Sequence, residues 1–255
     1  MSKILLLSHQ RAGTAIYCNA FNNFHSMVNP KFIPCISEVY TDEYIKRKKF
    51  IKNFNLNENK IKNKNSAELT KTFLYTFKLK NFIIKYFPLA IEQFCSKELT
   101  LDFIHNLCLN GGVNIYFLYR KNILDSIISL LISNYTNIWH IDSIRKIQIN
   151  YNDIKFSKDF LKTNIYYGLK EIELCHSYYL ILKTENILSN IITYEDNILK
   201  KNFEFANSLP PYYEKLNSDE NKEIVLRNNP LIISYMKRYL SVININCSDN
   251  FIIQL

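Results

Sequence analysis

Glycine and proline are scarce in this sequence, and long apolar runs are missing from it. The 255 residues include four glycines and six prolines, which leaves little room for linkers or low-complexity spacers. No apolar run reaches the roughly 18–20 residues that a membrane-spanning helix requires. The first apolar run begins at Ile4, too early for a signal peptide to precede it. We therefore expect a single domain over residues 1–255 that spans no membrane and resides in the cytoplasm.

Paired cysteines and metal-ligand spacings are also missing. None of the six cysteines forms a CxxC pair, and none stands at a spacing typical of a zinc site. Most of them lie within apolar segments, where a reduced and buried thiol is the expected state. We therefore expect no bound metal. The cysteines are Cys18, Cys35, Cys95, Cys108, Cys175 and Cys247.

Positive charge exceeds negative charge by nine, with 32 Lys and Arg residues against 23 Asp and Glu residues. Such an excess favours an anionic ligand or an acidic acceptor, because the summed field of a basic protein attracts anions. The lysines are scattered along the chain, so a generally basic surface explains the same excess. Charge alone leaves both interpretations open.

Short, continuously apolar segments alternate with longer segments of helical spacing. This alternation predicts an α/β fold in which a parallel sheet is covered by helices on both faces. Pro88 is expected to end one helix, and Gly111-Gly112 another. Residues 178–182 have a strand-like composition within a mostly helical region. The expected strands are 4–7, 31–36, 113–119 and 190–194, and the expected helices are 14–26, 67–87, 89–109, 122–135, 157–189, 195–207 and one or two within 219–241.

The segment from Ile4 to Thr14 has the character of a strand, a tight turn and the start of a helix. An apolar run ends at Ser8, and Arg11 and Gly13 follow before a helix-compatible segment. The free N–H groups and the dipole of a helix N-terminus favour negative charge, and Arg11 adds a cation. Gly13 lets the backbone approach an anion without a Cβ in the way. We therefore expect an anion site at this first turn.

A second turn repeats this arrangement. Arg120 stands at the end of an apolar strand segment, and Ser129 lies nine positions later in the next helix. Because ligands of parallel α/β sheets bind beyond the carboxyl ends of the strands, both arginines can face one crevice. An arginine and a hydroxyl suit a phosphate monoester, the first by paired charge and the second by a donated hydrogen bond. Ser126 and Ser133 share the helix face of Ser129, and for them we expect close helix packing.

These two segments resemble the sulfotransferases that use 3′-phosphoadenosine 5′-phosphosulfate (PAPS). Residues 10–14, Gln-Arg-Ala-Gly-Thr, are similar to the 5′-phosphosulfate loop of that family. Residues 120–129 are similar to its 3′-phosphate motif in the bacterial nodulation-type spacing. Residues 194–196 resemble a Tyr-Glu-Asp that follows a late strand in the family, and residues 139–140 resemble a Trp-His of its bacterial and carbohydrate-directed members. The ordered similarities extend from residue 4 to about 209.

The resemblance implies a P-loop-like, three-layer α/β/α fold and transfer of a sulfuryl group from PAPS to an acceptor hydroxyl, without a metal. Arg11 would hold the 5′-phosphosulfate and stabilise the departing phosphate, while Arg120 and Ser129 would bind the 3′-phosphate. The implied partner is a carbohydrate or another small-molecule acceptor, and not a nucleic acid. The residues that would bind the donor are Arg11, Ala12, Gly13, Thr14, Arg120 and Ser129.

Sulfuryl transfer also needs a group that takes the proton of the acceptor hydroxyl. Glu38 is the first candidate, because it follows the second expected strand and resembles a glutamate near the acceptor in bacterial members. His140 is the second candidate, and His9 in the first turn is the third. Glu195 and Asp196 are expected to cap a helix and to brace the sheet without entering the chemistry.

Two departures from the family pattern leave other functions open. Ala12 and Ala15 stand where the family often has hydroxyl residues, and the late Arg-Lys-Gly segment of cytosolic animal members has no counterpart. A catalytically silent protein that binds a sulfated or phosphorylated ligand is therefore one alternative. A P-loop kinase-like phosphotransferase is another, and the missing Walker lysine and magnesium residues argue against it.

Overall fold

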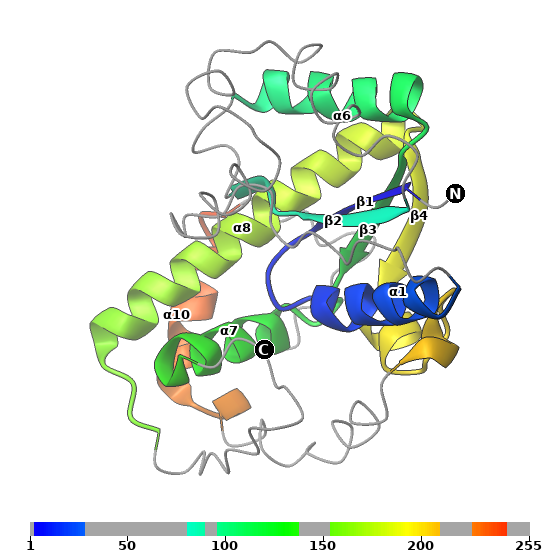
Figure 1. Ribbon diagram of the computed structural model, residues 1–255. Coiled ribbons are helices and arrows are strands. Elements are labelled where there is room, and N and C mark those ends of the chain that lie inside the picture. The colour runs from blue at the N-terminus through cyan, green and yellow to red at the C-terminus, as the bar shows by residue number, and fades with distance from the viewer. Residues whose placement is uncertain (1–2, 29–80, 90–95, 138–153, 210–225, 244–255) are drawn as a thin grey trace.

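A computed structural model of the chain describes residues 3–28, 81–89, 96–137, 154–209 and 226–243. Four strands form one sheet: β1 (Lys3–Ser8), β2 (Phe82–Tyr86), β3 (Asn114–Tyr119) and β4 (Leu188–Thr193). Their order across the sheet is β2-β1-β3-β4, and all three pairings are parallel. The prediction of an α/β protein with a parallel sheet flanked by helices is confirmed (Figure 1). The strand expected at 31–36 lies outside the described residues.

Alternate residues of the strands supply two separate hydrophobic cores. Leu5 and Leu7 of β1 face the core that α6 (Lys97–Gly111), α7 (Ile123–Thr136), α8 (Lys158–Thr184) and α10 (Pro230–Leu240) build. Ile4 and Leu6 face the other core, to which α1 (Thr14–Val28) contributes Tyr17 and Phe21. Because side chains alternate along a strand, the part of a strand that is covered on both faces is expected to be apolar, as residues 4–7 of β1 are.

Helix boundaries follow local capping chemistry at several places. Ser96 begins α6 and Ser157 begins α8, each accepting a hydrogen bond from the backbone N–H three residues later. Gly112 ends α6 with a φ of 59°, and its N–H donates to the carbonyl oxygen of Leu107. The predicted stop at Gly111-Gly112 is confirmed, since a glycine adopts this left-handed conformation without a Cβ penalty.

One prediction of secondary structure in the described sheet was wrong. Residues 82–86, expected within a helix over 67–87, form strand β2, and all five of its residues are buried. A short run of this kind, apolar except for the buried Lys85, fits a strand covered on both faces better than an amphipathic helix. Residues 178–182, despite their strand-like composition, belong to α8, in agreement with the helix expected over 157–189. Tyr178, Tyr179 and Leu182 are buried there at helical spacing, whereas Leu180 is exposed.

The segment after β4 also differs from its prediction. Instead of a helix over 195–207, a π-helical turn (η2, Tyr194–Ile198) and a 3₁₀ turn (η3, Ala206–Ser208) follow the strand. Thr193 is the N-cap of η2, and its hydroxyl accepts a hydrogen bond from the N–H of Asp196. Glu195 and Asp196 therefore lie inside the turn rather than at its cap, which frees their carboxylates for other contacts. In the 219–241 region, α10 confirms one expected helix.

Candidate functional site

The first predicted turn joins the carboxyl end of β1 to α1. Arg11 and Gly13 both have positive φ angles, of 64° and 93°. A Cβ on Gly13 would lie 2.6 Å from Cδ2 of Tyr194 and 3.6 Å from Cγ2 of Ile198. The backbone conformation and the packing of the tyrosine ring therefore both require glycine here. This corrects the expectation that the missing Cβ makes way for an anion, because Tyr194 fills that space.

Ala12 and Thr14 are both buried beside this turn. The methyl group of Ala12 belongs to the hydrophobic core on the α1 face, so Ala12 can offer a ligand only its backbone. Thr14 is the first residue of α1, and the first backbone N–H groups of a helix have no partner within that helix. Anion binding by the amides of residues 12–14 therefore stays a prediction, and the side chain of the alanine adds no donor to it.

His9 connects the ends of the two central strands and is fully buried. Its Nδ1 lies 2.8 Å from the carbonyl oxygen of Gln10, and its Nε2 accepts a hydrogen bond from the N–H of Arg120 at 3.2 Å. This pattern requires the tautomer with the proton on Nδ1. Burial lowers the pKa of His9 to about 4, so the ring is neutral at physiological pH. With both nitrogens engaged, His9 fixes the geometry of the two turns and is a poor candidate for a base.

Glu171 on α8 is a site residue that the sequence did not reveal. It is buried, and its Oε1 accepts a hydrogen bond from the N–H of Gln10 at 3.2 Å. Its partner lies 161 positions away in the chain, and no local motif links the two. Ser8 adds a second tie, since its hydroxyl donates to the carbonyl oxygen of Leu118 at 2.6 Å. The first turn is therefore held from both α8 and β3.

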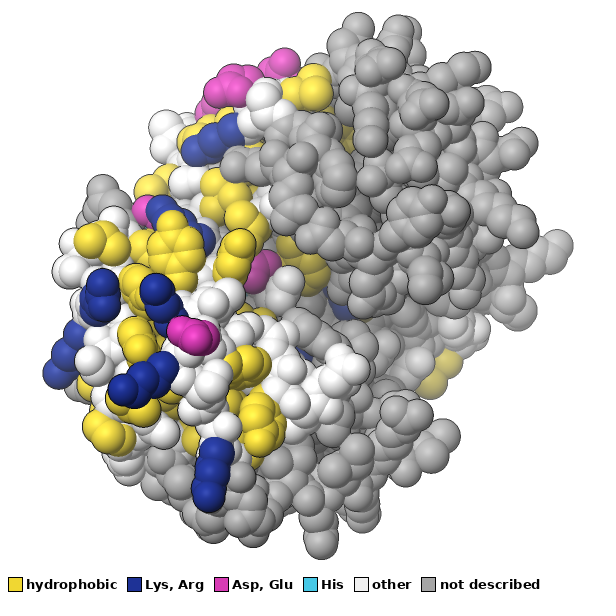
Figure 2. Space-filling view, turned by 90° about the vertical axis from the view of Figure 1, so that its left-hand side faces the viewer, with side chains coloured by type: hydrophobic (Ala, Val, Ile, Leu, Met, Phe, Trp, Pro, Cys, Tyr) yellow, Lys and Arg dark blue, Asp and Glu magenta, His cyan; other side chains and the backbone are white. Residues whose placement is uncertain are grey.

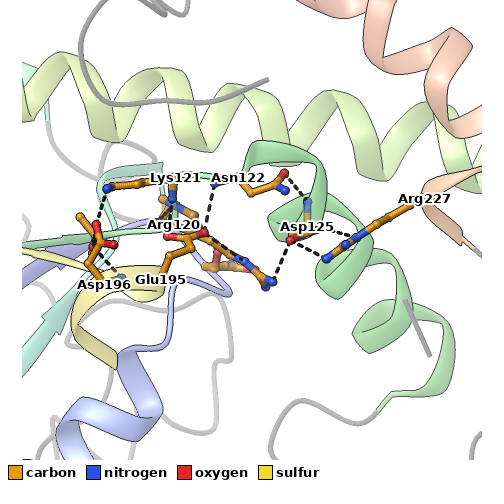
Figure 3. A network of polar contacts seen from close by, with 10 residues as sticks. Arg120, Lys121, Asn122, Asp125, Glu195, Asp196 and Arg227 are labelled. Carbon is orange, nitrogen blue, oxygen red and sulfur yellow. Dashed lines mark hydrogen bonds and ion pairs between the residues drawn. The ribbon is translucent and has the colours of Figure 1, made fainter. Parts of the chain in front are cut away.

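The second predicted turn carries Arg120 at the end of β3, and its side chain is largely buried. The Nη2 atom lies 3.3 Å from Oδ2 of Asp125, and Nε lies 3.8 Å from Oε1 of Glu195. The guanidinium carbon lies 4.7 Å from the centroid of the Tyr194 ring. Arg120 therefore meets two carboxylates and an aromatic face, as Figure 3 shows for the carboxylates.

Glu195 accepts hydrogen bonds from the backbone of the loop between β3 and α7. Its Oε2 accepts the N–H of Lys121 at 2.9 Å, and its Oε1 accepts the N–H of Asn122 at 3.1 Å. Asp196, next in the chain, forms ion pairs with Lys121 and Lys200. The hydrogen bonds from these two lysines lower the pKa of Asp196 to about 2. The two carboxylates thus have a structural role, as predicted. They hold the neighbouring loop between β3 and α7 rather than cap a helix (Figure 3).

Asp125 ties this loop to the C-terminal part of the chain. Arg227 donates from Nη2 to Oδ2 of Asp125 at 2.8 Å, and its Nε lies 2.7 Å from Oδ1 as an ion pair. Figure 3 shows Asp125 between Arg120 and Arg227. The sequence did not indicate this contact, because Arg227 belongs to no motif and lies 102 positions from its partner.

The two predicted motifs meet at Arg11 and Ser129. Nε of Arg11 donates a hydrogen bond to Oγ of Ser129 at 3.0 Å, joining the β1–α1 turn to the middle of α7. The side chains of Ser126 and Ser133 are buried on the same helix, and Ser133 donates to the carbonyl oxygen of Ser129. These two serines therefore take part in packing and helix geometry, as expected.

Other predicted site residues lie outside the described part of the chain. Glu38 and His140, the first two candidates for the base, belong to this set, and so does Trp139. Within the described residues, no group of three or more His, Cys, Asp or Glu side chains could hold a metal ion. None of the helices described there is both long and apolar enough to cross a membrane.

Arginine side chains and the N–H groups at the start of a helix are chemically suited to bind an anion. Arg11, Arg120 and the start of α1 meet at the carboxyl edge of a parallel sheet, where ligands of such folds bind. On the face shown in Figure 2, lysine and arginine side chains are spread among hydrophobic ones.

Comparisons of the chain with protein-family models, curated proteins and solved structures found no match.

Proposed function

We propose that the chain is a sulfotransferase that moves the sulfuryl group of PAPS to a hydroxyl of a carbohydrate or another small acceptor. The observation that carries this proposal is the hydrogen bond from Arg11 to Ser129. The resemblance concerned two motifs far apart in the chain, and it implied that both bind one nucleotide. Contact between a residue of each motif supports that implication, since one nucleotide can bind both motifs only if they lie close together.

In this proposal the first turn binds the 5′ end of the donor. Arg11 and the amides of Ala12, Gly13 and Thr14 interact with the phosphosulfate. The acceptor oxygen bonds to sulfur while the bond between sulfur and the 5′-phosphate oxygen breaks. Arg11 stabilises the negative charge that collects on the departing phosphate. The acceptor proton passes to a base, for which Glu38 and His140 remain the candidates.

The second turn binds the 3′-phosphate that distinguishes this donor from ordinary adenine nucleotides. Arg120 supplies the cation, and Ser129 supplies a hydroxyl that already contacts Arg11. The guanidinium of Arg120 is held by its neighbours, so little entropy is lost when an anion arrives. A P-loop-like fold is part of this proposal and agrees with the parallel sheet order around β1.

Thermal unfolding with added nucleotides tests this function. We expect 3′-phosphoadenosine 5′-phosphate to raise the melting temperature well above any effect of ATP with magnesium, because binding to the native state stabilises it. In the Arg120→Ala variant, this nucleotide should lose far more affinity than adenosine 5′-phosphate does. A shift with ATP but none with the 3′-phosphorylated nucleotide would refute the sulfotransferase proposal.

A catalytically silent binding protein is the second candidate, and the surroundings of Arg120 favour it. Two carboxylates already contact this arginine, and the side chain of Ala12 adds no hydroxyl to the first turn. Transfer of radioactive sulfate from labelled PAPS to a panel of sugars separates the two candidates. Binding of the nucleotide without transfer to any acceptor favours the binder. If transfer occurs, Glu38→Gln and His140→Gln identify the base by the loss of kcat.

A further inference from the structure

We propose that Arg227 is a positioning residue of the second turn, which keeps Arg120 able to bind an anion by neutralising Asp125. The inference rests on the proposed function, since the anion is taken to be the 3′-phosphate of the nucleotide. It assigns a task to a residue from the C-terminal region that belongs to none of the motifs.

The geometry shows which arginine holds Asp125 more closely. Arg227 approaches both carboxylate oxygens, at 2.7 Å and 2.8 Å, whereas Arg120 reaches only Oδ2, at 3.3 Å. The contact from Nη2 of Arg227 is a hydrogen bond as well as an ion pair, whereas Arg120 and Asp125 form an ion pair only. Charge-assisted hydrogen bonds are the stronger of the two kinds of contact. Asp125 therefore interacts more strongly with Arg227 than with Arg120, so Arg120 is less tightly bound to this carboxylate.

The sum of charges shows why this matters. Arg120, Arg227, Asp125 and Glu195 together carry two positive and two negative charges. Without Arg227 the same group would carry a net charge of minus one, and Arg120 would face two carboxylates alone. The side chains of Arg120 and Asp125 are only 10% and 9% exposed, so water screens their interaction poorly. A phosphate would then be repelled from its own binding residue.

Glu195 differs from Asp125 in this respect. Its two oxygens accept the backbone N–H groups of Lys121 and Asn122, so its charge is partly met without an arginine. The side chain of Asp125 has no such backbone donor among its contacts in the described residues, where both of its partners are arginines. Asp125 is therefore the carboxylate whose neutralisation depends on Arg227.

Charge compensation can be separated from direct binding by four variants of the full chain. Arg227→Gln leaves Arg120 as the arginine that faces Asp125, Asp125→Asn removes the carboxylate, and the double variant removes both charges. Arg238→Gln on α10 is the matched control, because Arg238 is exposed and its removal changes the net charge equally. Calorimetric titration gives Kd for 3′-phosphoadenosine 5′-phosphate and for adenosine 5′-phosphate in each variant.

We expect Arg227→Gln to raise the Kd of 3′-phosphoadenosine 5′-phosphate about tenfold and to raise the Kd of adenosine 5′-phosphate much less. The double variant should return to within about threefold of wild type, because the repelling carboxylate is gone. Arg238→Gln should stay close to wild type. Circular dichroism and melting temperatures show whether each variant is folded.

Several results would overturn the inference. No rescue in the double variant would make Arg227 a direct ligand, and equal losses in Arg227→Gln and Arg238→Gln would indicate only a general effect of charge. Additive changes in urea stability across the Asp125 and Arg227 variants would show that the pair is not coupled, whatever the nucleotide does. If the wild-type chain binds neither nucleotide, the proposed function fails, and this result is distinct from wild-type binding without rescue.

Discussion

At the scale of single residues, Gly13 is the position where the first turn tolerates least change. Its φ is 93°, and the ring of Tyr194 occupies the place of a Cβ. Gly112 offers a comparison, since it also has a positive φ, of 59°, but a Cβ there would meet nothing within 4 Å. The two glycines thus separate the cost of backbone strain from the cost of a steric clash.

We predict that Gly13→Ala lowers the free energy of unfolding by more than about 2 kcal/mol, since strain and clash act together. Gly112→Ala should lower it by about 1 kcal/mol, because strain acts alone. Urea unfolding followed by circular dichroism measures both values. Equal losses in the two variants would show that Tyr194 does not press on Gly13.

The pH dependence of stability reports on His9. Burial lowers the folded-state pKa to about 4, against 6.5 in the unfolded chain, so the unfolded state takes up a proton first as the pH falls. The stabilisation is therefore complete above pH 6.5 and declines between pH 6.5 and 4. The loss from His9 amounts to about 3 kcal/mol over this range.

Histidine NMR and urea unfolding at several pH values test this prediction. The ring signals of His9 should show no titration between pH 8 and 5, and His9→Asn should flatten the pH dependence of stability. His105→Asn is the control, since His105 is partly exposed and pairs with Glu185 near the surface. A His9 titration near pH 6.5 would contradict its burial.

At the scale of elements, Glu195 connects the turn after β4 with the start of α7. We predict that Glu195→Ala lowers the free energy of unfolding by about 1–3 kcal/mol, because two backbone N–H groups lose their acceptor. The exchange of the amide protons of Lys121 and Asn122 should also become faster. Glu185→Ala removes a carboxylate from a surface pair and should cost at most about 1 kcal/mol. Unchanged amide exchange at residues 121 and 122 would show that the hydrogen bonds to Glu195 do not protect this loop.

Elements with a strong local signal were predictable from the sequence. β1 and β3 each contain an apolar run, over residues 4–7 and 115–119, that an arginine-bearing turn follows, and α6 ends at its glycine pair. β2 was missed because its apolar residues continue a pattern that also fits a helix. The π-helical turn of η2 was missed because nothing in the sequence distinguishes its Thr193 cap from the cap of an ordinary helix.

The site was predictable only where a motif lies within one turn and its helix. Arg11, Arg120 and Ser129 stand in such motifs, and the contact between Arg11 and Ser129 agrees with their expected proximity. Glu171 and Arg227 were missed because neither lies in a local motif and because their partners are more than 100 positions away in the chain. The packing of Tyr194 on Gly13 was missed for the same reason, since only the folded sheet brings β4 beside the first turn.

At the scale of the whole molecule, two cores pack against opposite faces of one sheet. Cys18 is buried in the core on the α1 face, and Cys175 is buried in the core beneath α8. Cys108 is only partly buried. Because a buried thiol reacts only after its surroundings open, the three cysteines report on different parts of the fold.

We predict that chains retaining only Cys18 or only Cys175 react with a thiol reagent at the same slow rate, set by global unfolding. A chain retaining only Cys108 should react faster. Urea should raise the two slow rates in parallel, measured by mass spectrometry of timed samples. Different rates for Cys18 and Cys175 would show that the two cores open independently.

The place of β1 inside the sheet also affects how the chain folds while it is being synthesised. β1 is made first, but it lies between β2 and β3, so both of its hydrogen-bonded edges are satisfied only after residue 119 has left the ribosome. The hydrogen bond between Arg120 and His9 forms no earlier. Until then β1 is an apolar strand without β2 and β3, and an unpaired strand edge of this kind promotes aggregation while the chain is being synthesised.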